Sequence, residues 1–369
     1  MEKLSIKELL IKYSDYFYYI SLAIGLLSFT WLDFKDASFI NKFDTIRIII
    51  SMFFLSLRGI SLLIIDKKYV LKSLIVALPF IISFCFFNRT IYFIQSLAFI
   101  LCAYKIDKNK AIKIVISSSI ITFLVAIIGY LTKTINITIE LPQYYSRFRC
   151  YFGFKHPSYF SIHYCAILFG TWYLYYKDKH IKTIIIFILS ALFLFFVPNT
   201  RTSALLVLLF PIILLVSKYI VKSNNKLLKN LVILLPIILT IASLILMFIV
   251  KPALPSSFLE TFTIRFTQAH NYYNEYGIHL FKSSKLWLDN VYLFLLESFG
   301  IVCTIFYIGL LSLLNKKLIK EKDYHILSIA IFFLIYALMD NYGINLRFNI
   351  SLLFISETLI NLDTIFHKN

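Results

Sequence analysis

Charged side chains are scarce in this sequence. Asp, Glu, Lys and Arg make up only 15% of its 369 residues, whereas they make up about a quarter of a typical soluble domain. Apolar residues make up 60%, and the mean hydropathy is +0.81. Many apolar stretches reach about 20 residues, the length that crosses a bilayer. The composition therefore excludes an ordinary soluble globular protein and predicts an all-α integral membrane protein.

Cysteines are few and the common catalytic motifs are missing. Five cysteines without a CxxC pair do not indicate a disulfide framework. The sequence has no HExxH, P-loop or GxGxxG pattern. His156 and His163 are seven residues apart and do not on their own predict a zinc site, so we expect neither a metal nor another cofactor. No removable signal peptide is evident, because the charged N-terminus leads into a full apolar segment.

Twelve apolar ranges predict roughly twelve transmembrane helices in a single membrane domain over residues 1–369. Two connections between them are long, 132–158 and 251–290. The fourth and last ranges are short or polar, so a re-entrant segment stays an alternative there. No internal repeat is visible. The expected spans lie near 16–32, 46–65, 72–87, 90–104, 112–131, 159–176, 183–198, 202–220, 231–250, 291–314, 325–339 and 349–366.

Lysine positions follow the alternation of these spans. With the N-terminus inside, 22 of the 37 basic residues fall in short cytoplasmic segments, and all 22 are lysines. This agrees with the positive-inside rule. It predicts a multi-pass protein of the cytoplasmic membrane with both termini in the cytoplasm and both long connections outside. The net charge of +18 then reflects topology and does not predict a nucleic-acid partner.

Arginines have the opposite distribution. Seven of the eight map to the outer face, and Arg58 lies within a span, where Glu297 and Glu357 are candidate partners. The arginine fork grips phosphate or carboxylate with two hydrogen bonds, so these residues predict an anion-binding surface beside lipid, suited to a lipid-linked phosphate or pyrophosphate. The alternative is that each arginine snorkels or pairs with a nearby acid. The outer arginines are Arg47, Arg89, Arg147, Arg149, Arg201, Arg265 and Arg347.

The end of the first long connection brings basic residues to a helix start. Arg147 and Arg149 precede Gly153, which permits a tight turn, and Pro157 suits the first turn of the next span. His156 then lies at a helix N-terminus, where the dipole favours anions.

A second helix start follows the segment Pro-Asn-Thr-Arg-Thr-Ser. Asn199 or Thr200 can cap the helix, which puts Arg201 in its first turn. A cation there opposes the helix dipole, and a bound external anion would relieve this conflict.

The second long connection contains a capping-box pattern at Ser257 and Glu260. The apolar spacing after it predicts an amphipathic helix that lies on the membrane and carries Arg265 and His270. Asp289 follows at the outer mouth of a span. Its alternative role is to cap the helix that begins there.

Together these pieces resemble bacterial polysaccharide polymerases of the Wzy type, in the wider O-antigen polymerase and ligase group. The topology resembles the family over nearly the whole chain, whereas the short motifs cover a small part of it. The wider group often has His-Asn where this chain has Asp289-Asn290. The matching motifs are the segment from Arg149 through Gly-Phe-x-His-Pro-Ser, Asn-Thr-Arg-Thr-Ser before a span, an arginine in the second long connection, and Leu-Asp-Asn-x-Tyr-x-x-x-Leu-x-x-x-Gly.

The resemblance implies a GT-C-like fold and metal-independent glycosyl transfer outside the cytoplasmic membrane, in capsule, exopolysaccharide or O-antigen synthesis. A glycan on polyprenyl pyrophosphate is transferred to the sugar end of another lipid-linked repeat unit, with a flippase and a chain-length regulator as further expected partners. Arginines stabilise the leaving pyrophosphate, and a carboxylate or histidine accepts the proton of the acceptor hydroxyl. The expected catalytic residues are Asp289, with His156 and His270 as rivals. The expected substrate-binding residues are Arg147, Arg149, Arg201, Arg265, Asn290 and Tyr292.

Two other functions stay open. A glycan ligase would use the same donor with a different acceptor. A lipid-linked oligosaccharide flippase should expose polar groups through both leaflets, often on related halves, whereas here the polar groups concentrate on one face.

Overall fold

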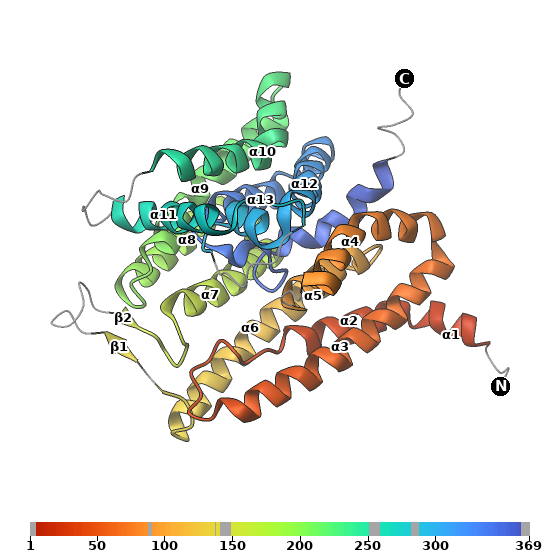
Figure 1. The fold of residues 1–369 in the computed structure, drawn as a ribbon, viewed down its shortest axis with the longest axis horizontal. Coiled ribbons are helices and arrows are strands. Elements are labelled where there is room, and N and C mark those ends of the chain that lie inside the picture. Colours follow the sequence, from red (N-terminus) through yellow and green to blue (C-terminus); the bar gives the residue numbers. More distant parts are fainter. Residues whose placement is uncertain are drawn as a thin grey trace. The chain divides into compact units, whose positions relative to one another are not determined.

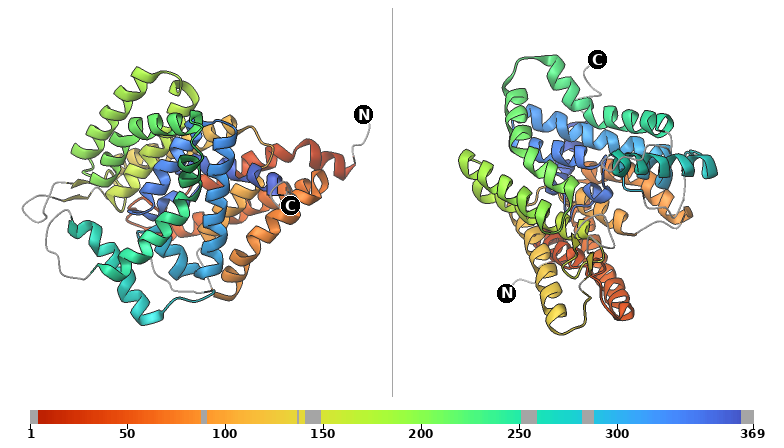
Figure 2. Two further views of the ribbon diagram at one scale, coloured as in Figure 1. Left: turned by 90° about the horizontal axis from the view of Figure 1, so that it is seen from above. Right: turned by 90° about the vertical axis from the view of Figure 1, so that its left-hand side faces the viewer.

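A computed structural model describes residues 5–87, 91–136, 138–140, 149–250, 259–281 and 288–362. Most of this described part is helical, as Figures 1 and 2 show from three directions. The helices are α1 (Ile6–Lys12), α2 (Ser14–Leu26), α3 (Ala37–Ile65), α4 (Lys67–Phe87), α5 (Ile91–Cys102), α6 (Lys108–Leu131), α7 (Pro157–Thr171), the π-helix η1 (Trp172–Tyr176), α8 (His180–Phe196), α9 (Arg201–Lys222), α10 (Lys226–Ile249), α11 (Leu259–Tyr276), α12 (Val291–Lys320), α13 (Tyr324–Tyr336), and the 3-10 helices η2 (Asn341–Ile344) and η3 (Ile350–Leu362). A two-residue strand pair, β1 (Ile139–Glu140) and β2 (Arg149–Cys150), is antiparallel.

Six helices of the described part are long and apolar enough to cross a membrane, namely α3, α4, α6, α9, α10 and α12. Four shorter helices, α5, α8, α13 and η3, are also apolar. Each of the twelve apolar ranges overlaps a helix. The helical content and these apolar helices support the expectation of an all-α membrane protein. The number of twelve spans stays a prediction.

Apolar side chains on the outside of several helices fit this assignment. On α3, Ile46, Ile49 and Phe53 are 57%, 64% and 58% exposed. Their spacing of three and four residues places them on one helical face. A large exposed apolar face is unusual on a soluble monomer, but it is the expected surface where a helix contacts lipid.

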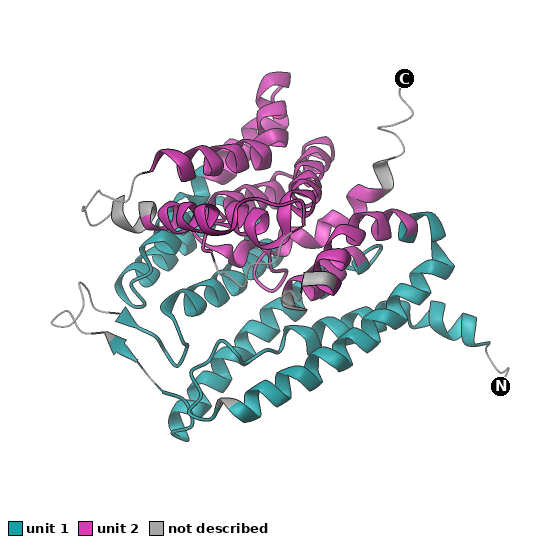
Figure 3. Ribbon diagram, viewed as in Figure 1, with its two compact units in different colours: residues 1–70, 102–212 teal, residues 71–101, 213–369 magenta. Residues whose placement is uncertain are grey.

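The chain divides into two compact units, each built from two segments (Figure 3). Unit 1 comprises residues 1–70 and 102–212, and unit 2 comprises residues 71–101 and 213–369. The segment carrying α5 and most of α4 therefore belongs with the C-terminal part of the chain. The single membrane domain expected over residues 1–369 stays a prediction, because this division into compact units does not test it.

Arg58 connects three segments of unit 1. Its side chain is fully buried on α3, and its Nη1 lies 2.9 Å from a carboxylate oxygen of Asp15. The same guanidinium donates to the hydroxyl of Ser14 and to the carbonyls of Cys102 and Tyr104. The expected pairing of Arg58 with Glu297 or Glu357 is therefore wrong. Apolar spacing along a helix does not indicate which neighbouring segment supplies the acid.

Arg47, another residue of α3, pairs with an acid on its own helix. Its Nε donates to Asp44 Oδ1 at 2.8 Å, and Nη1 donates to the carbonyl of Gly25. Both charged side chains of the pair are almost completely buried. Arg47 thus follows the local-pairing alternative, and only the other outer arginines stay candidates for an anion site.

The first long connection folds against the segment that follows α2. The Asp33 amide donates to the carbonyl of Gly153 at 2.8 Å, and the Lys155 amide donates to the carbonyl of Trp31 at 2.9 Å. Leu32, Ala126, Ile135, Phe154 and Phe160 form a small apolar core beneath these bonds. Gly153 has a φ of 81°, which confirms the expected tight turn, since glycine adopts this left-handed conformation without strain.

In unit 2, α12 is interrupted at Gly300, where φ is 89° and ψ is 174°. The Ile301 and Val302 amides, freed by the break, donate to the carbonyls of His279 and Leu280 at 3.0 and 3.2 Å. A Cβ on Gly300 would lie 2.4 Å from the Leu280 carbonyl oxygen, so only glycine fits. The span expected near 291–314 lies in a helix long and apolar enough to cross a membrane, and the break divides this helix where residues 279 and 280 of the second long connection supply backbone partners.

Residues 350–359, near the C-terminal end of the described part of unit 2, are largely buried. The 3-10 helix η3 packs against α12 and α13, and Leu352, Leu353 and Ile355 are completely buried. In the last turn of α12, Lys317 Nζ contacts the carboxylate of Glu357 on η3. Burial rather than lipid exposure therefore accounts for the apolar character of residues 350–359.

Sidedness can be tested on two exposed residues of unit 2. Lys226 begins α10 and Glu275 lies in the last turn of α11, and the lysine distribution places Lys226 inside and Glu275 outside. Single cysteines at these positions, in a cysteine-free background, should react with a membrane-impermeant maleimide from opposite faces. Reaction of both from outside intact cells would disprove the topology.

Candidate functional site

In unit 1, His156 lies at the start of α7. Its Nδ1 accepts the amide of Ser158 at 3.2 Å, which makes it the N-cap, and Pro157 occupies the first helical position as expected. The rings of Tyr151 and Tyr159 lie 6.2 and 6.1 Å from the imidazole. An Nδ1 that accepts an amide hydrogen carries no proton itself, so a proton transfer by this exposed side chain would use Nε2.

The start of α9 is tied to α7. Thr200 Oγ1 lies 2.6 Å from Ser161 Oγ, one turn into α7. Arg201 is the first residue of α9, which confirms its expected position. Asn199 has a φ of 52° and forms the tight turn before it. Two helix N-termini, one carrying His156 and one carrying Arg201, are thereby joined.

Three other predicted outer arginines are described less completely by the structure. Arg149 lies on β2, where it is the register partner of Glu140 on β1. Arg147 lies outside the described residues, as does Arg89. Arg149 and Arg201 belong to unit 1 and Arg265 to unit 2, and the convergence of all three on one cavity stays a prediction.

In unit 2, Arg265 and Asp289 form an ion pair. Arg265 Nε lies 3.3 Å from Asp289 Oδ2, and the side chains are 13% and 43% exposed. Arg265 projects from α11, which is anchored by the completely buried Phe266 and Ala269. The expected helix is present and packs against α10 and α12, while its expected place on the membrane stays a prediction. Ser257 of the expected capping box lies outside the described residues. A half-exposed carboxylate and a nearly buried guanidinium therefore lie together at the start of α12.

Asn290 caps α12, which corrects the alternative role considered for Asp289. Asn290 Oδ1 accepts the amides of Tyr292 and Leu293 at 3.0 and 3.1 Å. Its Nδ2 donates to Ser243 Oγ. Because the cap is already supplied by the next residue, the carboxylate of Asp289 is available for other chemistry.

Asn290 and Tyr292 were both expected to bind substrate. Each is 1% exposed, and the Tyr292 hydroxyl donates to the carbonyl of Leu334 at 2.7 Å. A direct contact of either side chain with a sugar would require these buried hydrogen bonds to break. Their substrate-binding role stays a prediction.

A second Asp-Asn pair, missed in the sequence, lies beside the first. Asn341 Nδ2 donates to the carbonyl of Leu288 at 2.8 Å, and Asn290 Nδ2 donates to the carbonyl of Leu338 at 3.2 Å. Each asparagine thus bonds the backbone just before the other pair, which places Asp340 next to Asp289. The signal in the sequence is the repeated dipeptide, Leu-Asp-Asn at 288–290 and Met-Asp-Asn at 339–341.

Asp340 is the more buried of the two carboxyl groups. It is 9% exposed, and it lies in the connection between α13 and η2. Its Oδ2 is 3.5 Å from the hydroxyl of Tyr336. Burial first, and then the nearby Asp289 carboxylate, raises the pKa of Asp340 well above its usual range, against the opposing effect of Arg265. The cluster therefore contains two carboxyl groups that differ in burial, and one cation.

His270 occupies the same helix as Arg265 and faces a different neighbour. Its ring lies edge-on to Phe248 of α10, with centroids 6.2 Å apart, and its Nδ1 is buried without a hydrogen-bond partner among the described residues. The structure brings together Arg265 and Asp289 of the expected site residues. It gives His270 no contact with either of them among the described interactions.

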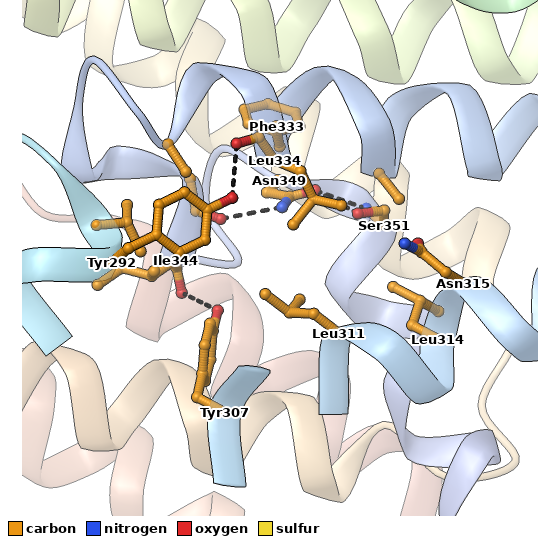
Figure 4. A pocket seen from close by; sticks show the side chains of 14 residues that line it. Tyr292, Tyr307, Leu311, Leu314, Asn315, Phe333, Leu334, Ile344, Asn349 and Ser351 are labelled. Atoms are coloured by element: carbon orange, nitrogen blue, oxygen red, sulfur yellow. Dashed lines mark hydrogen bonds between the residues drawn. The ribbon is translucent and has the colours of Figure 1, made fainter. Parts of the chain in front are cut away.

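The two cavities that we describe do not fit a glycan. The cavity behind Tyr292 in unit 2 has a volume of about 20 Å³ (Figure 4), which holds about one water molecule. Asn349 and Ser351 on its far side hydrogen-bond each other. The cavity of about 190 Å³ in unit 1 is lined mostly by apolar and aromatic side chains, including Tyr164 and Trp172. Neither cavity is lined by a carboxylate.

Among the described residues, no group of three or more His, Cys, Asp or Glu side chains is arranged to hold a metal ion. No protein-family model, curated protein or solved structure matches the chain at a significant level.

Proposed function

We propose that this protein polymerises polyprenyl-pyrophosphate-linked oligosaccharide repeat units on the outer face of the bacterial cytoplasmic membrane. It would do so as a metal-independent glycosyltransferase. We further propose twelve spans, cytoplasmic termini and a GT-C-like fold.

One observation carries the proposal: Arg265 and Asp289 lie 3.3 Å apart at the start of α12. Glycosyl transfer from a lipid pyrophosphate needs a cation for the leaving group and a base for the acceptor. Arginine has five donors in a fixed fork, so Arg265 can contact Asp289 through Nε and still offer its terminal nitrogens to a phosphate oxygen. The resemblance of the surrounding motifs to Wzy-type polymerases agrees with this division of roles.

The reaction follows from these two groups. The acceptor hydroxyl oxygen attacks the anomeric carbon of the donor glycan, and the bond between that carbon and the pyrophosphate oxygen breaks. The Asp289 carboxylate takes the hydroxyl proton, while Arg265 stabilises the negative charge that develops on the pyrophosphate. The products are a glycan longer by the donor chain and a free polyprenyl pyrophosphate. In unit 1, Arg201 and Arg149 are the proposed further contacts of the phosphates.

The charge asymmetry of the chain agrees with a lipid-linked anion on the outer face. Lysine alone would satisfy the topological rule, and lysine alone occurs in the predicted cytoplasmic segments. Arginine adds bidentate recognition of phosphate. A role in recognition explains why the predicted outer segments also carry arginine, where positive charge is otherwise disfavoured.

Deleting the gene in its native host tests the proposal, and the surface glycan gives the readout. A polymerase deletion should leave single repeat units on the cell surface, and the wild-type gene supplied on a plasmid should restore long chains. Full-length polymer that accumulates on its lipid carrier would indicate a ligase instead. Lipid-linked repeat units trapped on the cytoplasmic side would indicate a flippase, and either of these outcomes would refute polymerisation.

A further inference from the structure

The site in unit 2 contains a charge imbalance if both of its carboxyl groups are ionised. Asp289 and Asp340 would together carry two negative charges, and Arg265 supplies one positive charge. Two neighbouring carboxylates cannot both ionise without cost, and one then keeps its proton to a higher pH. An excess negative charge would also repel the pyrophosphate of the proposed substrate.

Burial indicates which carboxyl group keeps the proton. The side chain of Asp289 is 43% exposed and is paired with Arg265. Asp340 is 9% exposed, and desolvation disfavours its charged form.

The backbone holds this arrangement in place. The amide of Val291 donates to the carbonyl of Ala337 at 2.8 Å, in addition to the two reciprocal bonds of Asn290 and Asn341. Three hydrogen bonds therefore join the segment around Asp289 to the segment around Asp340. The backbone segments that carry Asp289 and Asp340 cannot move apart unless these bonds break.

We propose that Asp340 is a positioning residue that holds a proton beside Asp289 in the active protein, so that the pair carries a single negative charge balanced by Arg265. Loss of this proton in alkaline conditions would give the site a net negative charge and stop transfer. The groups that face Asp340 are Arg265 from α11, Asp289 from the start of α12 and Tyr336 from α13. The proposal rests on the proposed role of Asp289 as the base.

The variant Asp340→Asn tests this proposal, because asparagine has the shape of a protonated aspartate and cannot lose a proton. Polymer formation would be measured in right-side-out membrane vesicles from the native host while the external pH is varied. We expect a loss of about two- to tenfold near neutral pH, the effect of one altered neutral hydrogen bond. We also expect the alkaline decline of the wild-type protein to disappear. Asp33→Asn, which removes a carboxylate from unit 1, should leave the alkaline decline unchanged.

A second measurement does not depend on activity. Folding raises the pKa of Asp340, so its contribution to stability is full below the unfolded pKa of about 4 and is lost as pH rises through the folded pKa. Asparagine lacks this dependence. In detergent, the melting temperature of the full-length wild-type protein should therefore fall relative to that of Asp340→Asn as the pH rises above about 5.

The outcomes separate the two proposals. Superimposable pH profiles for wild type and Asp340→Asn would overturn the role of Asp340 in transfer. A difference in melting temperature between the wild type and Asp340→Asn that does not change with pH would overturn the proposal that Asp340 holds a proton. If vesicles lacking the protein still form the polymer, the proposed function fails, and the melting temperatures still decide whether Asp340 holds the proton.

Discussion

Replacing Asp289 by asparagine should reduce polymer formation by about a hundredfold or more, the range expected for removing a general base. Asparagine preserves the size of the side chain but cannot accept a proton. The fold should tolerate the change, because the cap of α12 is supplied by Asn290 and Asp289 is 43% exposed. Surface glycan length in a deletion strain carrying the variant gives the measurement, with the amount of protein in the membrane determined in parallel.

Asp323→Asn is a matched control for this experiment. Asp323 precedes α13, and its Oδ1 accepts the amide of Ile326 at 3.1 Å, which an asparagine oxygen can also do. This variant removes a carboxylate from another helix start of unit 2 and should keep normal polymer length. Full-length polymer from Asp289→Asn at a normal protein level would contradict the assignment of the base, and His270 and His156 would then be the remaining candidates.

The helices could be predicted from apolar runs because a backbone in lipid must satisfy its own hydrogen bonds. Residues 231–250 and α10 (Lys226–Ile249) illustrate the agreement. The break at Gly300 could not be predicted in this way, since it depends on the carbonyls of His279 and Leu280 from a different segment. The same applies to the segment after α2, whose extended backbone is paired with residues more than 100 positions away.

The candidate site could be predicted in part. Arg265 and Asp289 were each identified from local patterns, a basic residue on an amphipathic helix and an acid at the mouth of a span. Their contact across 24 positions, and the presence of Asp340, depend on how α11, α12 and α13 pack. The roles of individual polar residues also depend on neighbours: Asn290 and Tyr292 are engaged in buried hydrogen bonds, which their motif alone does not indicate.

Charge alone was a poor guide to the role of the arginines. Arg47 and Arg58 are both almost fully buried and paired with Asp44 and Asp15, so they stabilise unit 1 and need no substrate. Arg265 differs because its own side chain is 13% exposed, against 2% for Arg47 and Arg58, and because its ion pair stands at a helix start. The exposure of the arginine side chain, and not its charge alone, therefore distinguishes Arg265 from these internal ion pairs.

Replacing Arg265 by lysine should reduce polymer formation by about tenfold or more, and replacing it by glutamine should reduce it further, by about a hundredfold. Lysine keeps the charge but presents a single nitrogen in place of the planar fork, so it cannot contact Asp289 and a phosphate in the same geometry. Comparing the two variants separates the contribution of charge from that of shape. Normal polymer length in Arg265→Lys would show that the fork is not used.

The double variant Asp289→Asn, Arg265→Lys tests whether the two residues act together. Side chains in direct contact couple by about 0.5–3 kcal/mol, and the two atoms here are 3.3 Å apart. If Arg265 and Asp289 serve one transfer step, the double variant should lose little more activity than Asp289→Asn alone. The control is Asp289→Asn combined with Arg47→Lys, because Arg47 is bonded to Asp44 within unit 1 and should contribute independently. Losses that multiply in the Arg265 combination would mean that Arg265 and Asp289 act in separate steps.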